Sequence, residues 1–264
     1  MGLFGLEFSS KSIEELAVEI LTYSVPREQG PRLVFTANVD HIVQMRRLPE
    51  FRAAYDRAWV RTIDGFPVHL LARIEGSRTI PRVTGADLFA SLMLGLDPLS
   101  HRCFFVVSSA AIADRIGGYL LSRGFHRDSM QFCVPQFGFE LDAAFSDALA
   151  SRIRSHRTTH LFLGLGAPKS EIWCDGHAEA LGNCYVLCVG AGPEFFLGLK
   201  RRAPMIWRQY GFEWLWRFLH EPRRLFRRYF VDSWSFLLAI AEDHWGRRTG
   251  PDTGNVGGFG VPPS

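Results

Sequence analysis

Six short runs of apolar, β-branched and aromatic residues recur along the first 190 residues, and stretches with a helical pattern separate them. The runs occupy residues 33–36, 59–63, 103–107, 130–134, 161–165 and 185–189, and the clearest helical stretches are residues 111–121 and 145–155. Strands that alternate with helices form a mainly parallel sheet that helices cover on both faces. The sequence therefore predicts an α/β, Rossmann-like fold.

Small and polar residues directly follow most of these runs. They are Thr-Ala-Asn at residues 36–38, Asp-Gly at 64–65, Ser-Ser at 108–109, Gly-Leu-Gly-Ala-Pro-Lys at 164–169 and Gly-Ala-Gly at 190–192. In an open parallel sheet, ligands bind beyond the carboxyl ends of the strands. Glycines there let backbone N–H groups approach a phosphate, and a helix N-terminus stabilises its charge. This edge of the sheet is the predicted ligand site.

Each of these segments allows two interpretations when it is taken alone. Asp64 could act as a general base on a hydroxyl group, or it could be a turn residue, because Asp-Gly is a common turn pair. Thr36 and Asn38 could bind a ligand or cap the next helix. Residues 164–169 do not form Gly-x-Gly-x-x-Gly, because Lys169 stands in the last position, so a nicotinamide site has little support.

Two basic residues near these segments are also ambiguous. Arg82 opens the segment Arg-Val-Thr-Gly-Ala-Asp at residues 82–87, where it could hold a diphosphate or belong to a turn before a helix cap. Lys169 is one of only three lysines and falls just inside a predicted helix start. It could bind an anion there, or it could be an ordinary surface lysine.

Charge and aromatic content change together near residue 200. Residues 1–199 carry 19 basic and 21 acidic side chains, residues 200–264 carry 11 and 6, and five of the seven tryptophans lie at or after Trp207. We expect an α/β catalytic domain over residues 1–199, a basic, aromatic-rich helical appendage over residues 200–245, and a disordered tail over residues 246–264.

The basic, aromatic segment at residues 207–230 has three interpretations. It could bind nucleic acid, lie on a membrane surface, or pack as a helical subdomain whose arginines pair with Glu213 and Glu221. The negative net charge of residues 1–199 makes nucleic acid the least favoured of the three.

No apolar run reaches the roughly 18 residues of a spanning helix, and no secretory signal is visible. The five cysteines show no metal-type spacing and are predicted to be free thiols.

Together, these segments resemble the WecG/TagA/CpsF family of bacterial glycosyltransferases (glycosyltransferase family 26) over roughly residues 30–235. Residues 36–38, 64–65, 82–87 and 164–171 are similar to the family's Thr-Pro-Asn, Asp-Gly, Arg-Val-x-Gly-x-Asp and Gly-x-Gly-x-Pro-Lys-Gln-Glu segments, and residues 202–204, 213–217 and 221–224 are similar to its C-terminal signature. The chain departs from the family where Ala37 replaces proline, Ser170 replaces glutamine, and Gly-Pro-Glu-Phe at residues 192–195 replaces a segment that ends in Phe-Asp.

The resemblance implies an inverting, metal-independent glycosyltransferase that needs no cofactor. Its donor would be a UDP-sugar carrying N-acetylmannosamine, its uronic acid or a hexose. Its acceptor would be a polyprenyl-diphosphate-linked sugar used in cell-surface polysaccharide synthesis. The protein would be cytoplasmic and peripheral on the inner face of the plasma membrane, with the appendage docking there; a homo-oligomer is compatible with this picture, and no nucleic-acid partner is expected.

The same resemblance assigns roles to individual residues. Asp64 becomes the general base, and Thr36 becomes the second catalytic residue. Substrate binding falls to Asn38, Arg82, Asp87, Gly164, Gly166, Pro168, Lys169, Ser170, Glu171, Gly190, Arg202, Arg217, Arg224 and Arg227. The chemistry agrees, because an acceptor hydroxyl needs a base and a departing nucleoside diphosphate needs positive charge. The chain has no Asp-x-Asp motif, so arginines and helix N-termini would neutralise that charge.

Two other functions stay open on the sequence alone. Ser170 and Pro193 would suit a catalytically impaired member that binds a sugar nucleotide or acts as a scaffold in a polysaccharide assembly complex. A soluble α/β enzyme acting on another nucleotide, with its C-terminal helices as a dimer interface, is the third possibility.

Overall fold

A six-stranded, all-parallel sheet forms the centre of the molecule in the computed structural model, which describes residues 2–26, 29–76, 79–201, 203, 204, 207, 215, 216 and 233–249. Its strands are β3 (Arg32–Ala37), β4 (Val60–Ile63), β5 (Cys103–Val107), β6 (Met130–Cys133), β7 (His160–Gly164) and β8 (Tyr185–Cys188). These are the six runs that the sequence predicts, so the α/β fold is confirmed. A short antiparallel hairpin, β1 (Gly2–Leu3) with β2 (Leu6–Glu7), was not predicted.

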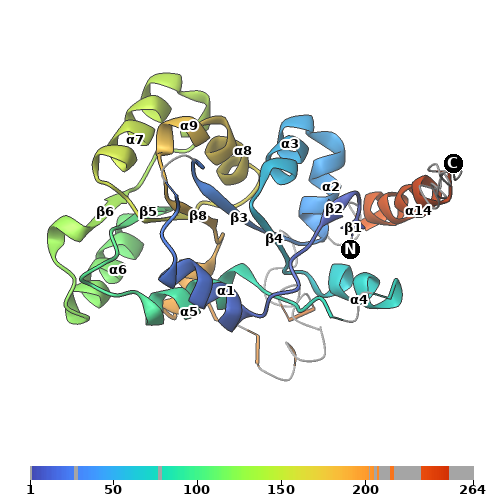
Figure 1. Cartoon of the computed structure of the whole chain (residues 1–264), viewed down its shortest axis with the longest axis horizontal. Helices are drawn as coiled ribbons and strands as arrows, with labels where there is room; N and C mark the ends of the chain where they lie inside the picture. The colour runs from blue at the N-terminus through green and yellow to red at the C-terminus, as the bar shows by residue number, and fades with distance from the viewer. Residues whose placement is uncertain are drawn as a thin grey trace, which may run out of the picture.

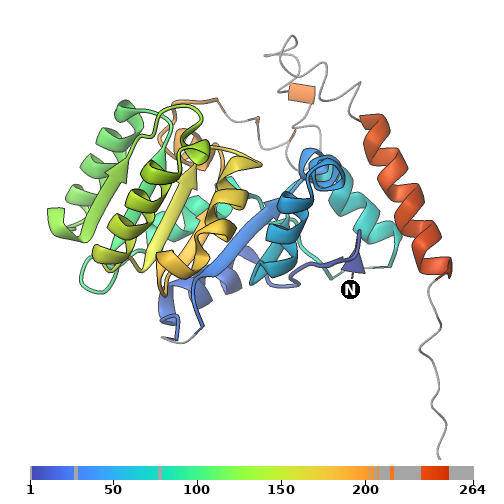
Figure 2. The same ribbon diagram turned by 90° about the horizontal axis from the view of Figure 1, so that it is seen from above.

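Helices cover both faces of this sheet (Figure 1, Figure 2). On one face lie α1 (Ile13–Thr22), α5 (Gly85–Gly95), α6 (Ala110–Ser122) and α10 (Gly192–Phe196); on the other lie α2 (Val39–Arg47), α3 (Pro49–Arg57), α4 (Phe66–Ile74), α7 (Ala143–Ser155), α8 (Lys169–Gly176) and α9 (Ala178–Leu181). Two 3₁₀ turns, η1 (Arg127–Ser129) and η2 (Phe139–Leu141), flank β6.

Successive strand residues enter opposite cores, as the two-residue period of a strand requires. Phe104 packs into the core under α2, α3 and α7, whereas its neighbour Phe105 packs into the core under α1, α5 and α6. Both rings are completely buried. Strands buried on both faces are apolar without alternation, which is why the six runs are continuous in the sequence.

The strand order β4-β3-β8-β7-β5-β6 reverses direction in the middle of the sheet. The chain adds β4 on one side of β3, crosses to form β5 and β6, and then returns to insert β7 and β8 between β5 and β3. Connections leave the sheet in opposite directions at such a point, and this leaves a crevice beyond the carboxyl ends of the strands. The fold therefore places a ligand crevice at the ends of β3, β8, β7 and β5.

The last described helix, α14 (Ser233–Thr249), lies beside α2 on the side of the molecule away from β6 (Figure 1). The Arg46 guanidinium donates to the Ser235 carbonyl oxygen (2.7 Å) and pairs with Glu242 (2.5 Å), and the rings of Phe4 and Phe236 are 5.9 Å apart. The predicted tail start at residue 246 falls within this helix.

Several sequence predictions for the C-terminal part remain predictions. Most of the basic, aromatic segment at residues 207–230 and all of residues 250–264 lie outside the described residues, and the division into domain, appendage and tail stays a prediction. Among the helices that the structure describes, none combines the length and the apolar character needed to traverse a bilayer. All five cysteines are buried free thiols, as predicted.

Candidate active site

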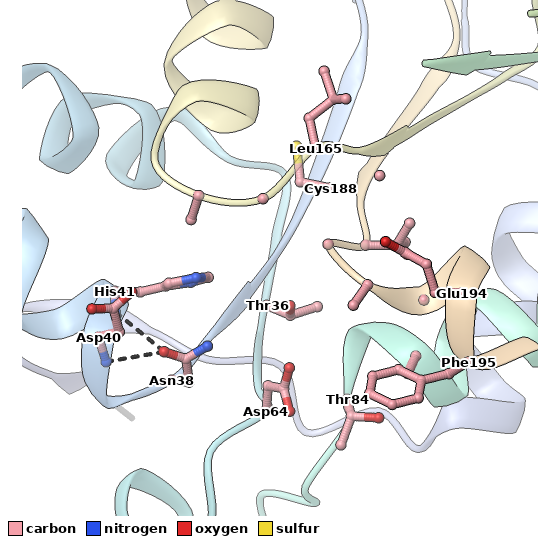
Figure 3. A pocket seen from close by; sticks show the side chains of 18 of the residues that line it. Thr36, Asn38, Asp40, His41, Asp64, Thr84, Leu165, Cys188, Glu194 and Phe195 are labelled. Carbon is pink, nitrogen blue, oxygen red and sulfur yellow. Dashed lines mark hydrogen bonds between the residues drawn. The ribbon is translucent and has the colours of Figure 1, made fainter. Parts of the chain in front are cut away.

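A cavity of about 360 Å³ opens at the carboxyl ends of β3, β4, β5, β7 and β8, at the sheet edge where the sequence places the ligand site (Figure 3). Its lining is mainly polar side chains and glycines. The lining residues are Thr36, Asn38, Asp40, His41, Asp64, Thr84, Ala86, Ser108, residues 164–167, Glu171, residues 188–192, Glu194, Phe195 and Lys200. The volume falls in the range of small-molecule sites, about 300–1,000 Å³.

Asp64 lies in this cavity because the end of β4 is tied to the end of β3. The backbone N–H groups of Asp64 and Gly65 both donate to the Ala37 carbonyl oxygen, at 2.8 and 3.2 Å. A Cβ atom on Gly65 would come within 3.1 Å of the Cα and Cβ atoms of Asn38, so glycine permits this close approach. The Asp-Gly pair therefore forms a turn and presents a carboxyl to the cavity at once.

Thr36 and Asn38 reach the cavity from the end of β3 (Figure 3). Thr36 is almost completely buried. The Asn38 side-chain oxygen accepts hydrogen bonds from the backbone N–H groups of Asp40 (3.0 Å) and His41 (3.3 Å), which caps α2. Asn38 therefore caps a helix and also lines the cavity, and its role in substrate binding stays a prediction.

Residues 82–87 mainly place the start of α5 against the carboxyl ends of the strands. Thr84 caps α5 by accepting from the Asp87 backbone N–H (3.0 Å), and its hydroxyl donates to the Asp87 carboxylate (2.7 Å). A Cβ atom on Gly85 would lie 3.2 Å from Thr36 Oγ1, so glycine allows this packing. The Arg82 guanidinium lies 3.5 Å from the Asp64 carbonyl oxygen. Neither Arg82 nor Asp87 is a lining residue: Arg82 lies next to the backbone of the lining residue Asp64, and Asp87 is part of the cap.

The glycine-rich loop after β7 contributes Gly164 and Gly166 to the lining. A Cβ atom on Gly164 would approach Pro193 Cγ to 3.0 Å and the Gly190 carbonyl oxygen to 3.3 Å. Gly166 (φ +86°) and Gly190 (φ +51°) adopt the left-handed conformation that favours glycine. These three predicted residues meet at one wall of the cavity.

The next residues of the same motif, at positions 168–171, make contacts with different parts of the protein. Pro168 precedes α8 as its N-cap residue, and the Lys169 ammonium lies 5.3 Å from the centroid of the Phe137 ring. The Ser170 hydroxyl donates to the Gly166 carbonyl oxygen (3.1 Å) and is buried. These three residues do not line the cavity, but Glu171 does.

The site contains residues that sequence reasoning missed. His41 lies in the first turn of α2, and its Nδ1 atom is 2.7 Å from the buried Tyr55 hydroxyl. Lys200 and Glu194 form an ion pair (3.4 Å) in the lining. Asp40 and Cys188 also line the cavity without having been predicted to bind substrate, whereas Ser108 lies at a strand end where the sequence places the ligand site. His41 follows Asn38 by three residues on a helix, a spacing that could have signalled a shared face.

Four predicted substrate-binding residues lie outside the described residues. They are Arg202, Arg217, Arg224 and Arg227. Within the described part of the chain, no group of three or more His, Cys, Asp or Glu side chains is placed to hold a metal ion.

The comparison with known families decides the class of the protein. The model of the glycosyl transferase WecG/TagA/CpsF family matches residues 1–250. The chain belongs to this family. The resemblance drawn from the sequence motifs is therefore confirmed, and the protein is a glycosyltransferase.

Curated relatives of this WecG/TagA/CpsF member include proteins from Staphylococcus aureus strains MW2, NCTC 8325 / PS 47 and MRSA252. Each is 21% identical over 240 residues, which cover 91% of this chain and 92% of the relative. Each is named N-acetylglucosaminyldiphosphoundecaprenol N-acetyl-beta-D-mannosaminyltransferase. The relatives therefore match this glycosyltransferase along nearly its full length, including every strand that contributes to the cavity.

Proposed function

We propose that this glycosyltransferase moves a sugar from a UDP-sugar to a polyprenyl-diphosphate-linked acceptor sugar in bacterial cell-surface polysaccharide synthesis. The staphylococcal relatives support the acceptor, because their name specifies N-acetylglucosaminyl-diphosphoundecaprenol. Their name also makes N-acetylmannosamine our first choice of transferred sugar; its uronic acid and a hexose are the alternatives. The cavity volume and its glycine-rich wall suit a nucleotide sugar.

The observation that carries the proposal is the position of the Asp64 carboxyl. It lies at the end of β4 in the cavity, beside Thr36 and Asn38 (Figure 3). We propose that Asp64 removes the proton from the acceptor hydroxyl, whose oxygen then attacks the anomeric carbon of the donor sugar. The bond from that carbon to the phosphate oxygen breaks, and UDP leaves with the electron pair. Attack from the face opposite UDP inverts the anomeric centre, and the β-linked product in the relatives' name agrees with inversion of an α-linked donor.

The leaving diphosphate gains negative charge as the bond breaks. Of the arginines that the motif comparison assigns to substrate, Arg82 is the one that lies within the described residues, and it is next to the Asp64 backbone. We propose that Arg217, Arg224 and Arg227 supply further positive charge and that no metal ion is obligatory. The segment that carries them would dock on the inner face of the plasma membrane, where a polyprenyl acceptor resides.

The test is transfer from UDP-sugars to a synthetic prenyl-diphosphate-linked N-acetylglucosamine, followed by mass spectrometry and release of UDP. Wild-type protein should form the disaccharide in the presence of a chelator, and Asp64→Asn should reduce kcat by about 10²-fold or more, the usual size of a general-base contribution. Asp114→Asn, on an exposed position of α6, is the matched control and should behave as wild type. Unchanged turnover by Asp64→Asn would contradict the proposed base.

The same experiment examines a second candidate function. The Ser170 hydroxyl is engaged by the Gly166 carbonyl oxygen and does not line the cavity, whereas the family has a longer glutamine at this position. A protein that binds UDP tightly and transfers none of the sugars tested would be a sugar-nucleotide-binding member of an assembly complex.

A further inference from the structure

Glu171 is a buried carboxyl in the wall of the cavity. It lies in the first turn of α8, only 3% of the residue is exposed, and it lines the same space as Asp64. Burial raises the pKa of this carboxyl to about 7, against a smaller lowering by a hydrogen bond with its own backbone. At neutral pH, Glu171 is therefore poised between its protonated and ionised forms.

The side chain also has an unsatisfied oxygen. Among the described residues, no hydrogen-bond partner exists for Glu171 Oε2. Buried polar atoms are nearly always hydrogen-bonded, and an ionised carboxylate without a partner is especially unfavourable in a protein interior. A buried, unpartnered oxygen in a ligand cavity marks a position where the ligand supplies the missing partner.

Among the residues that the structure describes, the neighbouring elements place no strong cation against this carboxyl. Tyr55 of α3 and Cys188 of β8 face it; burial is the main cause of their raised pKa values, and Glu171 raises both further. Arg57 of α3 pairs with Asp175 instead. The other titratable groups of the cavity lining are Asp40, His41, Asp64, Glu194 and Lys200, and Lys200 is paired with Glu194.

A diphosphate that enters this cavity meets several carboxyl groups. An ionised Glu171 would repel it, whereas a protonated Glu171 has an O–H group to donate. Hydrogen bonds to an ionised acceptor are roughly twice as strong as neutral ones. The approach of a negative charge also favours the neutral form of a nearby carboxyl.

We propose that Glu171 binds the diphosphate of the sugar nucleotide as a neutral carboxylic acid, taking up a proton from solvent and donating it in a hydrogen bond from Oε2 to a phosphate oxygen. This inference rests on the proposed nucleotide-diphosphate donor and adds the protonation state and the contact of one residue. It makes UDP binding a proton-uptake reaction. Affinity for UDP then falls as the pH rises above neutrality, by up to about tenfold per pH unit for one linked proton.

The experiment is calorimetric titration of the full chain with UDP at about pH 8, in buffers that differ in ionisation enthalpy. UDP is fully ionised there, because the second pKa of a phosphate monoester group is about 6. Wild-type protein should take up most of one proton per UDP. Glu171→Gln keeps a hydrogen-bond donor that cannot titrate, so it should bind UDP without proton uptake and with a nearly constant Kd from neutral to alkaline pH.

Glu140→Gln is the matched control. Glu140 Oε2 is also buried and unpartnered within the described structure, but this residue lies in η2 and does not line the cavity. This variant should retain the proton uptake of the wild type. Because Glu171→Gln could fail to fold, a second readout uses wild-type protein alone: UDP binding should produce the infrared stretching band of a protonated carboxylic acid.

The outcomes separate this inference from the proposed function. UDP binding by wild type without proton uptake and without the carboxylic-acid band overturns the role of Glu171 and leaves the UDP-sugar donor intact. Equal uptake by wild type and Glu171→Gln also overturns it, because another group would then carry the proton. Failure of wild-type protein to bind UDP overturns both.

Discussion

The Nδ1 atom of His41 lies 2.7 Å from the hydroxyl oxygen of Tyr55, and this contact joins a cavity-lining side chain to the buried core. The Tyr55 hydroxyl also donates to the Thr36 carbonyl oxygen (3.3 Å). One phenol group therefore orients the imidazole of α2 and contacts the strand end that bears Thr36. Tyr55 is completely buried, so these contacts form in an environment where water does not compete.

Tyr55→Phe should lower both stability and activity. The substitution leaves His41 Nδ1 and the Thr36 carbonyl without this partner, which should reduce the free energy of unfolding by about 1–3 kcal/mol. Loss of orientation at the cavity should reduce kcat several-fold. Urea denaturation and transferase assays measure the two effects.

Tyr185→Phe is the control for this prediction. The Tyr185 hydroxyl contacts Arg32 (3.1 Å), and both residues belong to the amino-terminal ends of their strands, away from the cavity. This variant should lose stability but keep the wild-type kcat. An equal loss of kcat in both variants would indicate a general effect of destabilisation and would refute the positioning role of Tyr55.

Gly65→Ala should damage the site more than the fold. Its new Cβ would sit 3.1 Å from Asn38 Cα and Cβ, so the turns after β3 and β4 would have to separate by a few tenths of an ångström. Displacement of Asp64, the proposed base, by even a fraction of an ångström would weaken proton transfer, so we expect kcat/KM to fall by about tenfold or more. Steady-state kinetics and a thermal melt measure the two effects.

Gly118→Ala is the control for this prediction, because it should change stability and not activity. A Cβ at this exposed position of α6 meets nothing within 4 Å. Alanine is a better helix former than glycine, so the variant should gain about 0.5–1 kcal/mol of stability with unchanged activity. Wild-type activity in Gly65→Ala would show that the close approach of the two turns is not needed for catalysis.

The sequence predicts the sheet and part of the site for the same physical reason. Strands buried on both faces must be apolar throughout, so the run at residues 103–107 marks β5 directly. The carboxyl ends of parallel strands converge, so Thr36 and Asp64 were expected to meet, and they line one cavity. The two-residue strands β1 and β2 are too short to leave a pattern.

Side-chain direction within a motif could not be predicted in this way. Lys169, Ser170 and Glu171 are consecutive, yet they contact the Phe137 ring, the Gly166 carbonyl oxygen and the cavity, respectively. Successive residues of a helix point about 100° apart, and the packing of α8 against α3 and β8 decides which one faces the ligand. The pairing of Glu194 with Lys200 depends on the turn after α10, in which the backbone N–H groups of Leu199 and Lys200 donate to the Glu194 carbonyl oxygen.

His160 should make the protein sensitive to acid. Burial, followed by the neighbouring His101, lowers the pKa of His160 to about 3, from an ordinary value of 6.5. The imidazole of His160 binds a proton near pH 6.5 in the unfolded chain but not in the folded chain. The stability associated with its neutral, buried form is therefore fully present above pH 6.5 and is lost as the pH falls toward 3. The free energy of unfolding, measured with urea, should therefore be lower at about pH 5 than at neutral pH by up to about 2 kcal/mol because of His160.

His160→Phe should flatten that part of the pH dependence. It keeps a ring against Phe162 and Tyr185 but leaves the Ile20 carbonyl oxygen without its partner, so its stability at neutral pH should be lower by about 1–3 kcal/mol. Replacement of the exposed His126 by Gln should preserve the wild-type pH dependence. If His160→Phe loses as much stability on acidification as wild type, other groups account for the acid sensitivity.

Glu171→Gln should stabilise the protein above neutral pH. The folded pKa of Glu171 is raised to about 7 from 4.5, so the folded chain holds this proton more tightly than the unfolded chain. The contribution of the protonated Glu171 carboxyl to the free energy of unfolding is complete below pH 4.5. It is lost as the pH rises through 7, where the buried carboxyl must ionise. At about pH 8 the neutral amide avoids this loss, which amounts to up to about 3 kcal/mol. Denaturation midpoints should therefore favour Glu171→Gln at pH 8, and the advantage should shrink on acidification; a constant difference at all pH values would show that burial does not raise the pKa of this carboxyl.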